Sequence, residues 1–368
     1  MSKVSLTKIG NDLYGAVNKA ISELGKPVIA RGDRVLIKPN LVRSEDPESG
    51  EIVHFSVIEA VARYCLDCGT AKVIIGEGPS YYQPRDRLRD CFTRTGVNEV
   101  ANRLGIEWVV FDEHKYRTFK KISDCTPDEF RVTEYVFDCD KIINLPVLKT
   151  HYLTKVTLAM KNLKGCLKWE DKIKFHQPDL NRAIVELNKI IKPTINIIDA
   201  TKWKTGGGLL IASTDIVAVD SVGCALMGID PMQVRMLTLG AVAGLGEANI
   251  TRIDIIGEEL KLLKFRVPLP QEQLKQSFPG LEIIGAEKAC SGCLIPLISG
   301  LMLLRERGAK MKRPITVYLG KNPLVPGQKL HLLVGDCAKV EGNKDSFITG
   351  CPPDREMIID RLAKLTIE

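Results

Sequence analysis

The sequence lacks several features that would place it at once in a familiar class. No apolar run reaches the ~20 residues that a membrane-spanning helix requires, so we expect no contact with a membrane. The first residues show neither the apolar stretch nor the small-residue cleavage site of a secretory signal, which favours a cytoplasmic protein. Aromatic residues make up only 6% of the chain. Proteins that bind nucleic acid usually combine stacking aromatics with concentrated basic charge, so we expect no nucleic-acid partner.

The composition is otherwise that of a globular protein with a full core. The chain has 368 residues, enough for two domains at roughly 150 residues each. Hydrophobic residues account for 45%, which excludes a disordered chain, and 52 basic against 45 acidic residues leave a net charge of +7. Eleven cysteines, an odd number without an export signal, indicate reduced thiols and not a disulfide framework.

The order of apolar segments predicts an α/β fold with a mainly parallel sheet flanked by helices. Strand-like runs alternate with helical patterns, as in consecutive βαβ units. We expect strands in 33–39, 71–76, 108–111, 141–146, 194–199, 252–257, 315–320 and 331–335, and helices in 56–66, 85–104, 215–227 and 354–365. The pattern changes at a mixed connector over 258–282. We therefore expect a first domain over 1–260 and a smaller, cysteine-bearing α/β lobe over 283–368.

Four cysteines in that lobe form the most informative pattern in the sequence. Cys290 and Cys293 make a C-x₂-C pair at the start of an apolar helix, and Cys337 and Cys351 follow at predicted element ends. Loop thiolates can turn toward a shared metal without disrupting a core, and four of them suit a [4Fe–4S] cluster or a tetrahedral zinc ion. Structural zinc more often uses two C-x₂-C pairs, and a proline follows Cys351, so the pattern favours the cluster. Four unrelated core cysteines are the other alternative.

We expect the remaining cysteines to have structural roles. Cys65 and Cys68 form a second C-x₂-C pair, but they lie within a predicted helix and no matching pair is nearby. We expect one of them to face the core and the other to cap the helix end. Most isolated cysteines are expected to be buried thiols, and Cys166 differs only because it lies in a basic segment.

That basic segment, 144–176, predicts a binding site for an anion. It contains seven lysines and two acids, and two of the five histidines of the chain, His151 and His176. Because the segment follows a strand, it begins at the carboxyl edge of the sheet, where open α/β folds bind ligands. Lys149 and Lys161 would contact a carboxylate or phosphate there, and the histidines would move protons near neutral pH. A solvated basic helix face is the alternative interpretation.

Other strand ends carry polar or glycine-rich turns that would complete this crevice. The candidates for substrate binding are Lys38, Asn40, Asn162, Asp199, Gly206 and Gly207. Lysine and amide groups supply charge and hydrogen-bond donors, and glycines let the backbone approach a ligand closely. The glycine loop matches neither a P-loop nor G-x-G-x-x-G, so it indicates no nucleotide site.

Several of these stretches resemble the DUF362 family, whose uncharacterised members are often described as iron–sulfur proteins. The similar stretches are IKPNL at 37–41, IIGEGPS at 74–80, NLPVLKTH at 144–151, MKNLKG at 160–165, IIDATKWKTGGG at 197–208, STDIVAVDSVGCALMGIDP at 213–231 and GLGEANITRIDIIG at 244–257. The resemblance implies the α/β fold and an iron–sulfur cluster, but no particular reaction. Family members often carry two dense cysteine runs, whereas this chain has a dispersed set, which argues against a two-cluster electron carrier.

Three functions are compatible with the sequence. The first is an iron–sulfur redox enzyme acting on a small anionic substrate, with Lys149, His151, Lys161 and His176 as catalytic residues and Lys38 helping to neutralise the substrate. The second is a non-enzymatic [4Fe–4S] module that carries electrons or docks on an electron-transfer protein. The third is a ligand-binding protein with a structural zinc ion. Parallel α/β domains commonly associate, so we also consider a homodimer.

Overall fold

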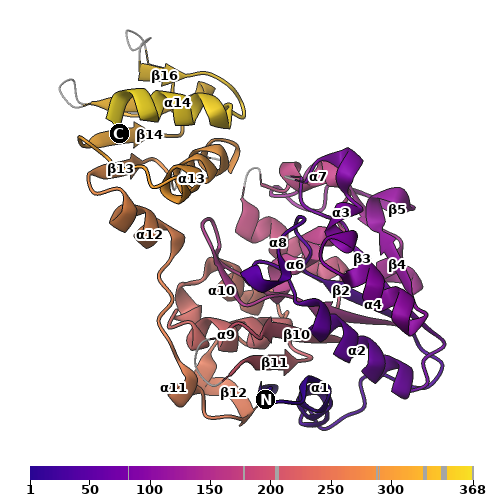
Figure 1. The fold of residues 1–368 in the computed structure, drawn as a ribbon. Coiled ribbons are helices and arrows are strands. Elements are labelled where there is room, and N and C mark those ends of the chain that lie inside the picture. The colour runs from indigo at the N-terminus through magenta and orange to yellow at the C-terminus, as the bar shows by residue number, and fades with distance from the viewer. Residues whose placement is uncertain are drawn as a thin grey trace. The chain divides into compact units, whose positions relative to one another are not determined.

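A computed structural model of the chain describes residues 1–81, 83–176, 179–203, 207–286, 289, 291–325, 330–340 and 346–366. The chain forms two compact units (Figure 1). The first contains Met1–Phe175 and Leu180–Val267, and the second contains His176–Asp179 and Pro268–Glu368. The fold is mixed α/β with a large, mainly parallel sheet and a separate, smaller parallel sheet, which confirms the predicted fold class.

The first unit is built on an eight-stranded sheet in the order β12-β1-β11-β10-β7-β2-β3-β4. Its strands are β1 (Ser2–Lys8), β2 (Arg34–Pro39), β3 (Lys72–Glu77), β4 (Glu107–Val110), β7 (Lys141–Leu145), β10 (Ile195–Ala200), β11 (Leu209–Ser213) and β12 (Ile253–Gly257). All neighbours are parallel except at β11, which runs against both β1 and β10. Val35 and Leu36 on β2 pack into the two different core clusters, one on each side of the sheet. A strand buried on both faces is apolar throughout, which is why such strands can be recognised in the sequence.

Helices cover both faces of this sheet (Figure 1). They are α1 (Leu13–Ser22), α2 (Phe55–Asp67), α3 (Asp90–Thr93), α4 (Val97–Leu104), α5 (Tyr135–Asp138), α6 (Ala159–Asn162), α7 (Trp169–Lys174), α8 (Leu180–Ile190), α9 (Ile216–Leu226), α10 (Arg235–Val242) and α11 (Leu260–Leu263). Residues of α1, α2 and α4 pack on one face, and residues of α8, α9 and α10 pack on the other. In α2, Cys65 is fully buried and Cys68 is the C-cap residue, as the sequence predicts.

The first unit differs from the sequence-based expectation in several places. The helix expected over 85–104 is broken, because Gly96 adopts a left-handed φ of 77° between α3 and α4. The apolar pattern does not predict strand β1, because the strand contains buried polar residues. Ser5, for example, hydrogen-bonds to Thr7 and to Glu23. Two antiparallel hairpins interrupt the βαβ pattern: β5 (Tyr116–Lys120) with β6 (Glu129–Thr133), and β8 (Lys149–His151) with β9 (Lys155–Thr157).

The second unit contains a parallel sheet in the order β13-β14-β15-β16. Its elements are α12 (Pro270–Ser277), β13 (Leu281–Ile284), α13 (Ser291–Glu306), β14 (Ile315–Tyr318), β15 (His331–Val334), β16 (Phe347–Ile348) and α14 (Arg355–Thr366). Helix α13 packs against α12 and α14. The segment expected as a connector, 258–282, therefore contains two short helices and the start of a strand.

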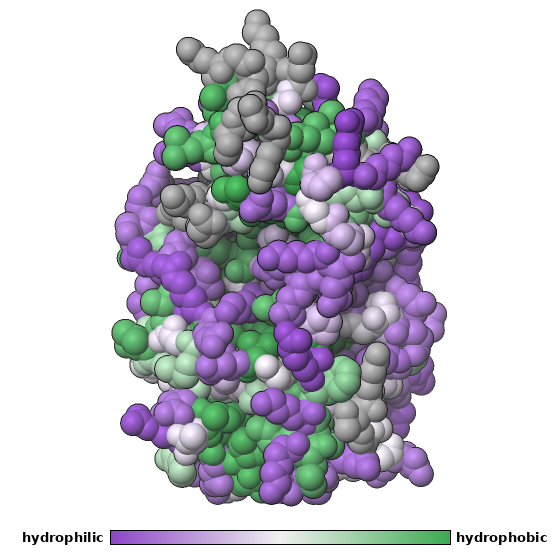
Figure 2. All heavy atoms as spheres, turned by 90° about the vertical axis from the view of Figure 1, so that its left-hand side faces the viewer, coloured by the Kyte–Doolittle hydropathy of each residue, from purple (hydrophilic) through white to green (hydrophobic). Residues whose placement is uncertain are grey.

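Hydrophilic side chains cover most of the face shown in Figure 2, and hydrophobic ones gather toward its lower end. The exposed large hydrophobic residues of the first unit include Val242 on α10, Leu262 on α11 and Phe265 just after it. In the described part of the chain, every helix is too short or too polar to span a lipid bilayer.

Candidate active site

The carboxyl ends of β2 and β7 meet where the strand order of the large sheet reverses. From β2 the chain continues to β3 and β4 on one side, whereas from β7 it continues to β10 on the other side. Open α/β folds bind ligands in the crevice at such a point. Lys38 and Asn40 come from the end of β2, Asn144 comes from β7, and Asn162 ends α6. Lys38, Asn40 and Asn162, which the sequence offers as substrate-binding candidates, thus meet at the switch point of the sheet, together with Asn144.

Lys38 is fully buried and forms an ion pair with Glu77 at the end of β3. Its Nζ lies 2.7 Å from Glu77 Oε2 and donates to the carbonyl oxygen of Pro39 at 2.9 Å. Glu77 also accepts hydrogen bonds from the backbone N–H groups of Leu41 and Gly78. The expectation that Lys38 neutralises a substrate is therefore revised. With 0% exposure and a carboxylate already in contact, Lys38 belongs to a buried polar layer at the strand ends, which we call the floor.

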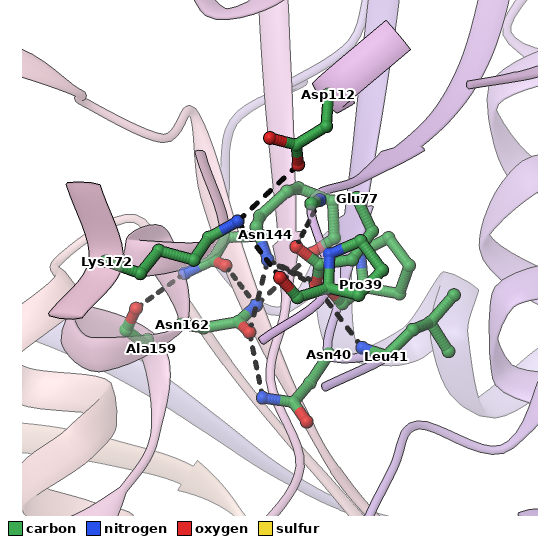
Figure 3. Close-up of polar contacts among 12 residues, drawn as sticks. Pro39, Asn40, Leu41, Glu77, Asp112, Asn144, Ala159, Asn162 and Lys172 are labelled. Atoms are coloured by element: carbon green, nitrogen blue, oxygen red, sulfur yellow. Dashed lines mark hydrogen bonds and ion pairs between the residues drawn. The ribbon is translucent and has the colours of Figure 1, made fainter. Parts of the chain in front are cut away.

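A chain of asparagine side chains extends this floor across three strands, and Figure 3 shows its members Asn40, Asn162 and Asn144. Asn162 Oδ1 accepts a hydrogen bond from Asn40 Nδ2 at 3.0 Å, and Asn162 Nδ2 donates to Asn144 Oδ1 at 2.8 Å. Asn144 Nδ2 donates in turn to Asn196 Oδ1 at 2.9 Å. Such a network holds its members in one arrangement, because a lost partner leaves a buried polar group unsatisfied. In the described part of the chain Asn40 Oδ1 is buried without a hydrogen-bond partner.

A second buried lysine lies at the same strand ends (Figure 3). Lys172 on α7 donates from Nζ to the carbonyl oxygen of Pro79 at 3.0 Å and lies 3.8 Å from Asp112 Oδ2. Burial lowers the pKa of Lys172, and the carboxylates of Asp112 and Glu77 oppose this shift. Two lysines and two carboxylates are therefore enclosed here, and their charges balance.

Asp220 on α9 holds the start of α6. Its two carboxylate oxygens accept the backbone N–H groups of Ala159 at 2.7 Å and Met160 at 3.0 Å. Burial raises the pKa of Asp220 to about 8, although both N–H groups act in the opposite direction. The sequence-based set of site residues does not include Asp220. Its signal in the sequence is a single acid in an otherwise apolar helix.

Four side chains, Lys149, His151, Lys161 and Lys164, form what we call the crevice group. They come from the hairpin β8–β9, from α6 and from the turn after α6. Lys149 lies directly opposite Thr157 in the hairpin, and Lys161 Nζ donates to Thr157 Oγ1 at 2.9 Å. Lys149 and Lys161 therefore approach each other from neighbouring elements. Lys149 also donates to the backbone carbonyl of Glu51 and lies 3.4 Å from its carboxylate.

Burial lowers the pKa values throughout the crevice group, and the charges of neighbouring lysines add to this effect at His151, Lys161 and Lys164. Burial, with a contribution from the charge of Lys149, lowers the pKa of Lys161 to about 7. Burial lowers the pKa of Lys164 well below its usual value, and the charges of Lys161 and Lys172 add to this effect. An anion placed among these lysines would favour their charged forms and so be bound more tightly.

His151 is held in one neutral form. Its Nδ1 accepts hydrogen bonds from the backbone N–H groups of Leu153 at 3.1 Å and Thr154 at 3.3 Å, which leaves the proton on Nε2. Burial, followed by the charges of Lys161, Lys164 and Lys149, lowers the pKa of His151 well below 6.5. The expectation that His151 titrates near neutral pH is therefore revised, and its role becomes that of an Nε2–H donor.

The other candidates occupy different surroundings. Asp199 is buried and accepts the backbone N–H groups of His54 at 2.9 Å and Thr201 at 2.8 Å, and it lines a small hollow of about 50 Å³. Gly207 lies in the exposed turn that follows, and Gly206 lies outside the described residues. His176 is buried in the segment His176–Asp179, which belongs to the second unit and not to the unit that carries the crevice group.

Three of the four predicted cysteine ligands lie around the ends of β15 and β16. Cys293 is buried against Gly335, where an added Cβ atom would lie 2.2 Å from the sulfur. The backbone N–H of Asp336 donates to the carbonyl of Gly350, which pairs the residues just before Cys337 and Cys351. Both of these cysteines are exposed.

These cysteines do not form a complete metal site in the described structure. Cys290 lies outside the described residues. Across the ranges that are described, no three His, Cys, Asp or Glu side chains are placed to hold a metal ion. The soft thiolate donors suit an iron–sulfur cluster or zinc, so the residue types fit the predicted group. The four-cysteine site therefore stays a prediction.

Known proteins resemble this chain over the region that carries the crevice. The family model of DUF362, a domain of unknown function, matches residues 35–225. The thylakoid-associated protein sll1697 of Synechocystis sp. is 28% identical over 349 residues, with 87% of this chain and 99% of that protein covered. The lactate racemase apoprotein from Thermoanaerobacterium thermosaccharolyticum aligns with 62% of this chain and 58% of its own, at 12% identity and a TM-score of 0.39. The family match contains the crevice group and the asparagine network, and the four C-terminal cysteines lie beyond it.

Proposed function

This chain belongs to the DUF362 family, and we propose that it is an enzyme that binds a small anionic substrate, a carboxylate or a phosphate, at the carboxyl ends of β2 and β7. The observation that carries the proposal is the geometry of the crevice group, in which Lys149 lies opposite Thr157 in the hairpin and Lys161 donates to the hydroxyl of the same threonine. Partly desolvated cations attract an anion far more strongly than the same charges do in water. The rigid floor of buried asparagines beside them would keep the binding geometry constant.

Each crevice residue has a distinct task in this proposal. Lys149 remains paired with Glu51 and supplies a fixed positive charge. Lys161, with a pKa of about 7, can gain or lose a proton at physiological pH, as general acid–base catalysis requires. Neutral His151 would donate a hydrogen bond from Nε2 to the substrate.

Anion binding should weaken as the pH rises from 7 to 9. A bound anion raises the pKa of Lys161 above its free value of about 7, so binding takes up a proton in this range. For one titrating lysine the affinity should fall by up to ~10-fold per pH unit. Isothermal titration calorimetry with malonate and with phosphate, in buffers of different ionisation enthalpy, measures both the affinity and the proton uptake.

The matched control for this experiment is an exposed lysine outside the crevice. Lys189 on α8 is 46% exposed and paired with Glu186, so Lys189→Met should leave binding unchanged. Lys161→Met should weaken binding and remove the proton uptake. Binding of equal strength in Lys161→Met, or the same affinity at every pH, would refute the assigned role of Lys161.

For the C-terminal unit we propose a [4Fe–4S] cluster with Cys290, Cys293, Cys337 and Cys351 as ligands. The support is that three cysteines from separate segments lie near one another. The sulfur of Cys293 packs against Gly335, and the hydrogen bond from Asp336 to Gly350 joins the segments that carry Cys337 and Cys351. When bound, such a cluster supplies electron transfer, which would make the enzyme an oxidoreductase served by an electron-transfer protein. A structural zinc ion is the competing occupant.

Metal analysis of anaerobically purified protein tests this proposal. We expect a brown protein with about four irons per chain, the content of one [4Fe–4S] cluster. Cys337→Ser should lose most of the visible absorption, whereas Cys68→Ser, in the other unit, should keep it. A colourless protein with one zinc ion, or an unchanged spectrum in Cys337→Ser, would contradict the assignment.

A further inference from the structure

We propose that Lys161 is a nucleophile that forms an imine with the carbonyl carbon of a 2-oxo acid bound in the crevice. This inference rests on the proposed anion-binding function and names the substrate class for it. A 2-oxo acid combines a carboxylate, which the other crevice lysines can bind, with a carbonyl group that an amine can attack.

The first argument is the hydrogen-bond environment of Lys161. Three other lysines near the crevice each have a carboxylate partner, at 2.7 Å for Lys38, 3.4 Å for Lys149 and 3.8 Å for Lys172. Lys161 Nζ instead donates to a neutral hydroxyl, that of Thr157. Within the described residues no carboxylate forms an ion pair with Lys161 or raises its pKa. Its amine is therefore not held in the ammonium form by a counterion.

The second argument is the position of Lys161 among fixed groups. Lys161 lies on α6, which is held at both ends. The first backbone N–H groups of α6 donate to Asp220, and the side chain of its last residue, Asn162, hydrogen-bonds to Asn144. Lys149 lies beside Lys161, and its pairing with Glu51 favours the charged form of Lys149. Lys149 is therefore the cation that would bind the carboxylate of the substrate while Lys161 attacks the carbonyl group. A lysine becomes nucleophilic when it is desolvated or placed next to another cation, and both conditions are met here.

The reaction needs no oxidant or reductant. The neutral amine of Lys161 attacks the carbonyl carbon, a C–N bond forms, and one amine proton passes to the carbonyl oxygen to make a hydroxyl group. Loss of this hydroxyl together with the second amine proton releases one water molecule and leaves the C=N bond. The hydroxyl of Thr157, in contact with Nζ, is placed to relay the proton.

Reductive trapping of the full-length protein tests the inference. The protein is incubated with pyruvate and sodium cyanoborohydride at pH 7, and the modified lysine is located by peptide mass spectrometry. We expect one dominant adduct, on Lys161. Lys161→Arg keeps the positive charge and should still bind pyruvate in calorimetry, but it should give no crevice adduct. Burial is the main cause of the lowered pKa of Lys161, and the charge of Lys149 adds to it, so Lys149→Met should move the pH of half-maximal trapping upward.

The outcomes separate this inference from the proposed function. Calorimetric binding of pyruvate without an adduct on Lys161 would overturn the imine and leave anion binding intact. No binding of pyruvate, malonate or phosphate would overturn both. Labelling spread over exposed lysines such as Lys189, and unchanged in Lys161→Arg, would also overturn the imine.

Discussion

Replacing Lys38 with methionine should lower the free energy of unfolding by about 3–5 kcal/mol, the usual cost of leaving one member of a buried ion pair without its partner. Lys38 is 0% exposed, and its ammonium lies 2.7 Å from the carboxylate of Glu77. In Lys38→Met that carboxylate keeps the N–H groups of Leu41 and Gly78 but loses the cation. Urea unfolding followed by tryptophan fluorescence is a suitable measurement, because Trp108, Trp169 and Trp203 all lie in the first unit.

Two further variants show whether buried charge causes this loss. Lys38→Met combined with Glu77→Gln should recover part of the stability, because no unpaired charge is then left inside the protein. Lys120→Met breaks the exposed pair with Glu129 and should leave the unfolding curve unchanged. A Lys38→Met protein as stable as the wild type would show that the floor of the crevice does not depend on this ion pair.

Asp220→Asn should destabilise the protein by about 2–4 kcal/mol at pH 5, because a buried N–H group loses its acceptor. The two carboxyl oxygens each accept one backbone N–H, from Ala159 and Met160, and both keep lone pairs when the group is protonated, as it is at pH 5 in the folded protein. An asparagine offers one oxygen, and its NH₂ group would face the second N–H donor. Since α6 carries Lys161, we also expect Asp220→Asn to weaken binding of malonate.

The stability loss in Asp220→Asn should depend on pH in a definite direction. Burial raises the pKa of Asp220 to about 8 in the folded protein, whereas an unfolded aspartate titrates near pH ~4. The folded state therefore holds a proton that the unfolded state has released. This contribution is complete below pH ~4 and is lost as the pH rises toward 8, by up to ~1.4 kcal/mol per pH unit.

Unfolding curves at pH 5, 6.5 and 8 check this prediction. The difference between the wild type and Asp220→Asn should be largest at pH 5 and smallest at pH 8. Asp128→Asn, at a side chain that is 93% exposed, serves as the control and should match the wild type throughout. A constant difference over this range would mean that Asp220 is ionised in the folded protein at pH 5.

The fold class and the edge of the sheet that carries the crevice follow from local patterns in the chain. Strands such as β2 and β3 are buried on both faces, so their apolar runs are continuous and easy to recognise. The polar residue that ends such a run, Lys38 on β2 for example, then lies at the carboxyl edge of the sheet by necessity. Strand β1 cannot be recognised in this way, because it contains a buried serine and a buried threonine. These side chains form hydrogen bonds with each other and with Glu23.

The charge state of each lysine depends on contacts between distant parts of the chain. Lys38 and Glu77 are 39 positions apart, and the asparagine that joins them to α6 is 124 positions from Lys38. The local sequence around Lys38 and Lys161 does not distinguish the two lysines. Folding places a carboxylate beside the first and a hydroxyl beside the second. A lysine's pKa is set by burial and by the charges within a few ångströms, and neither quantity exists until the strands and helices have packed.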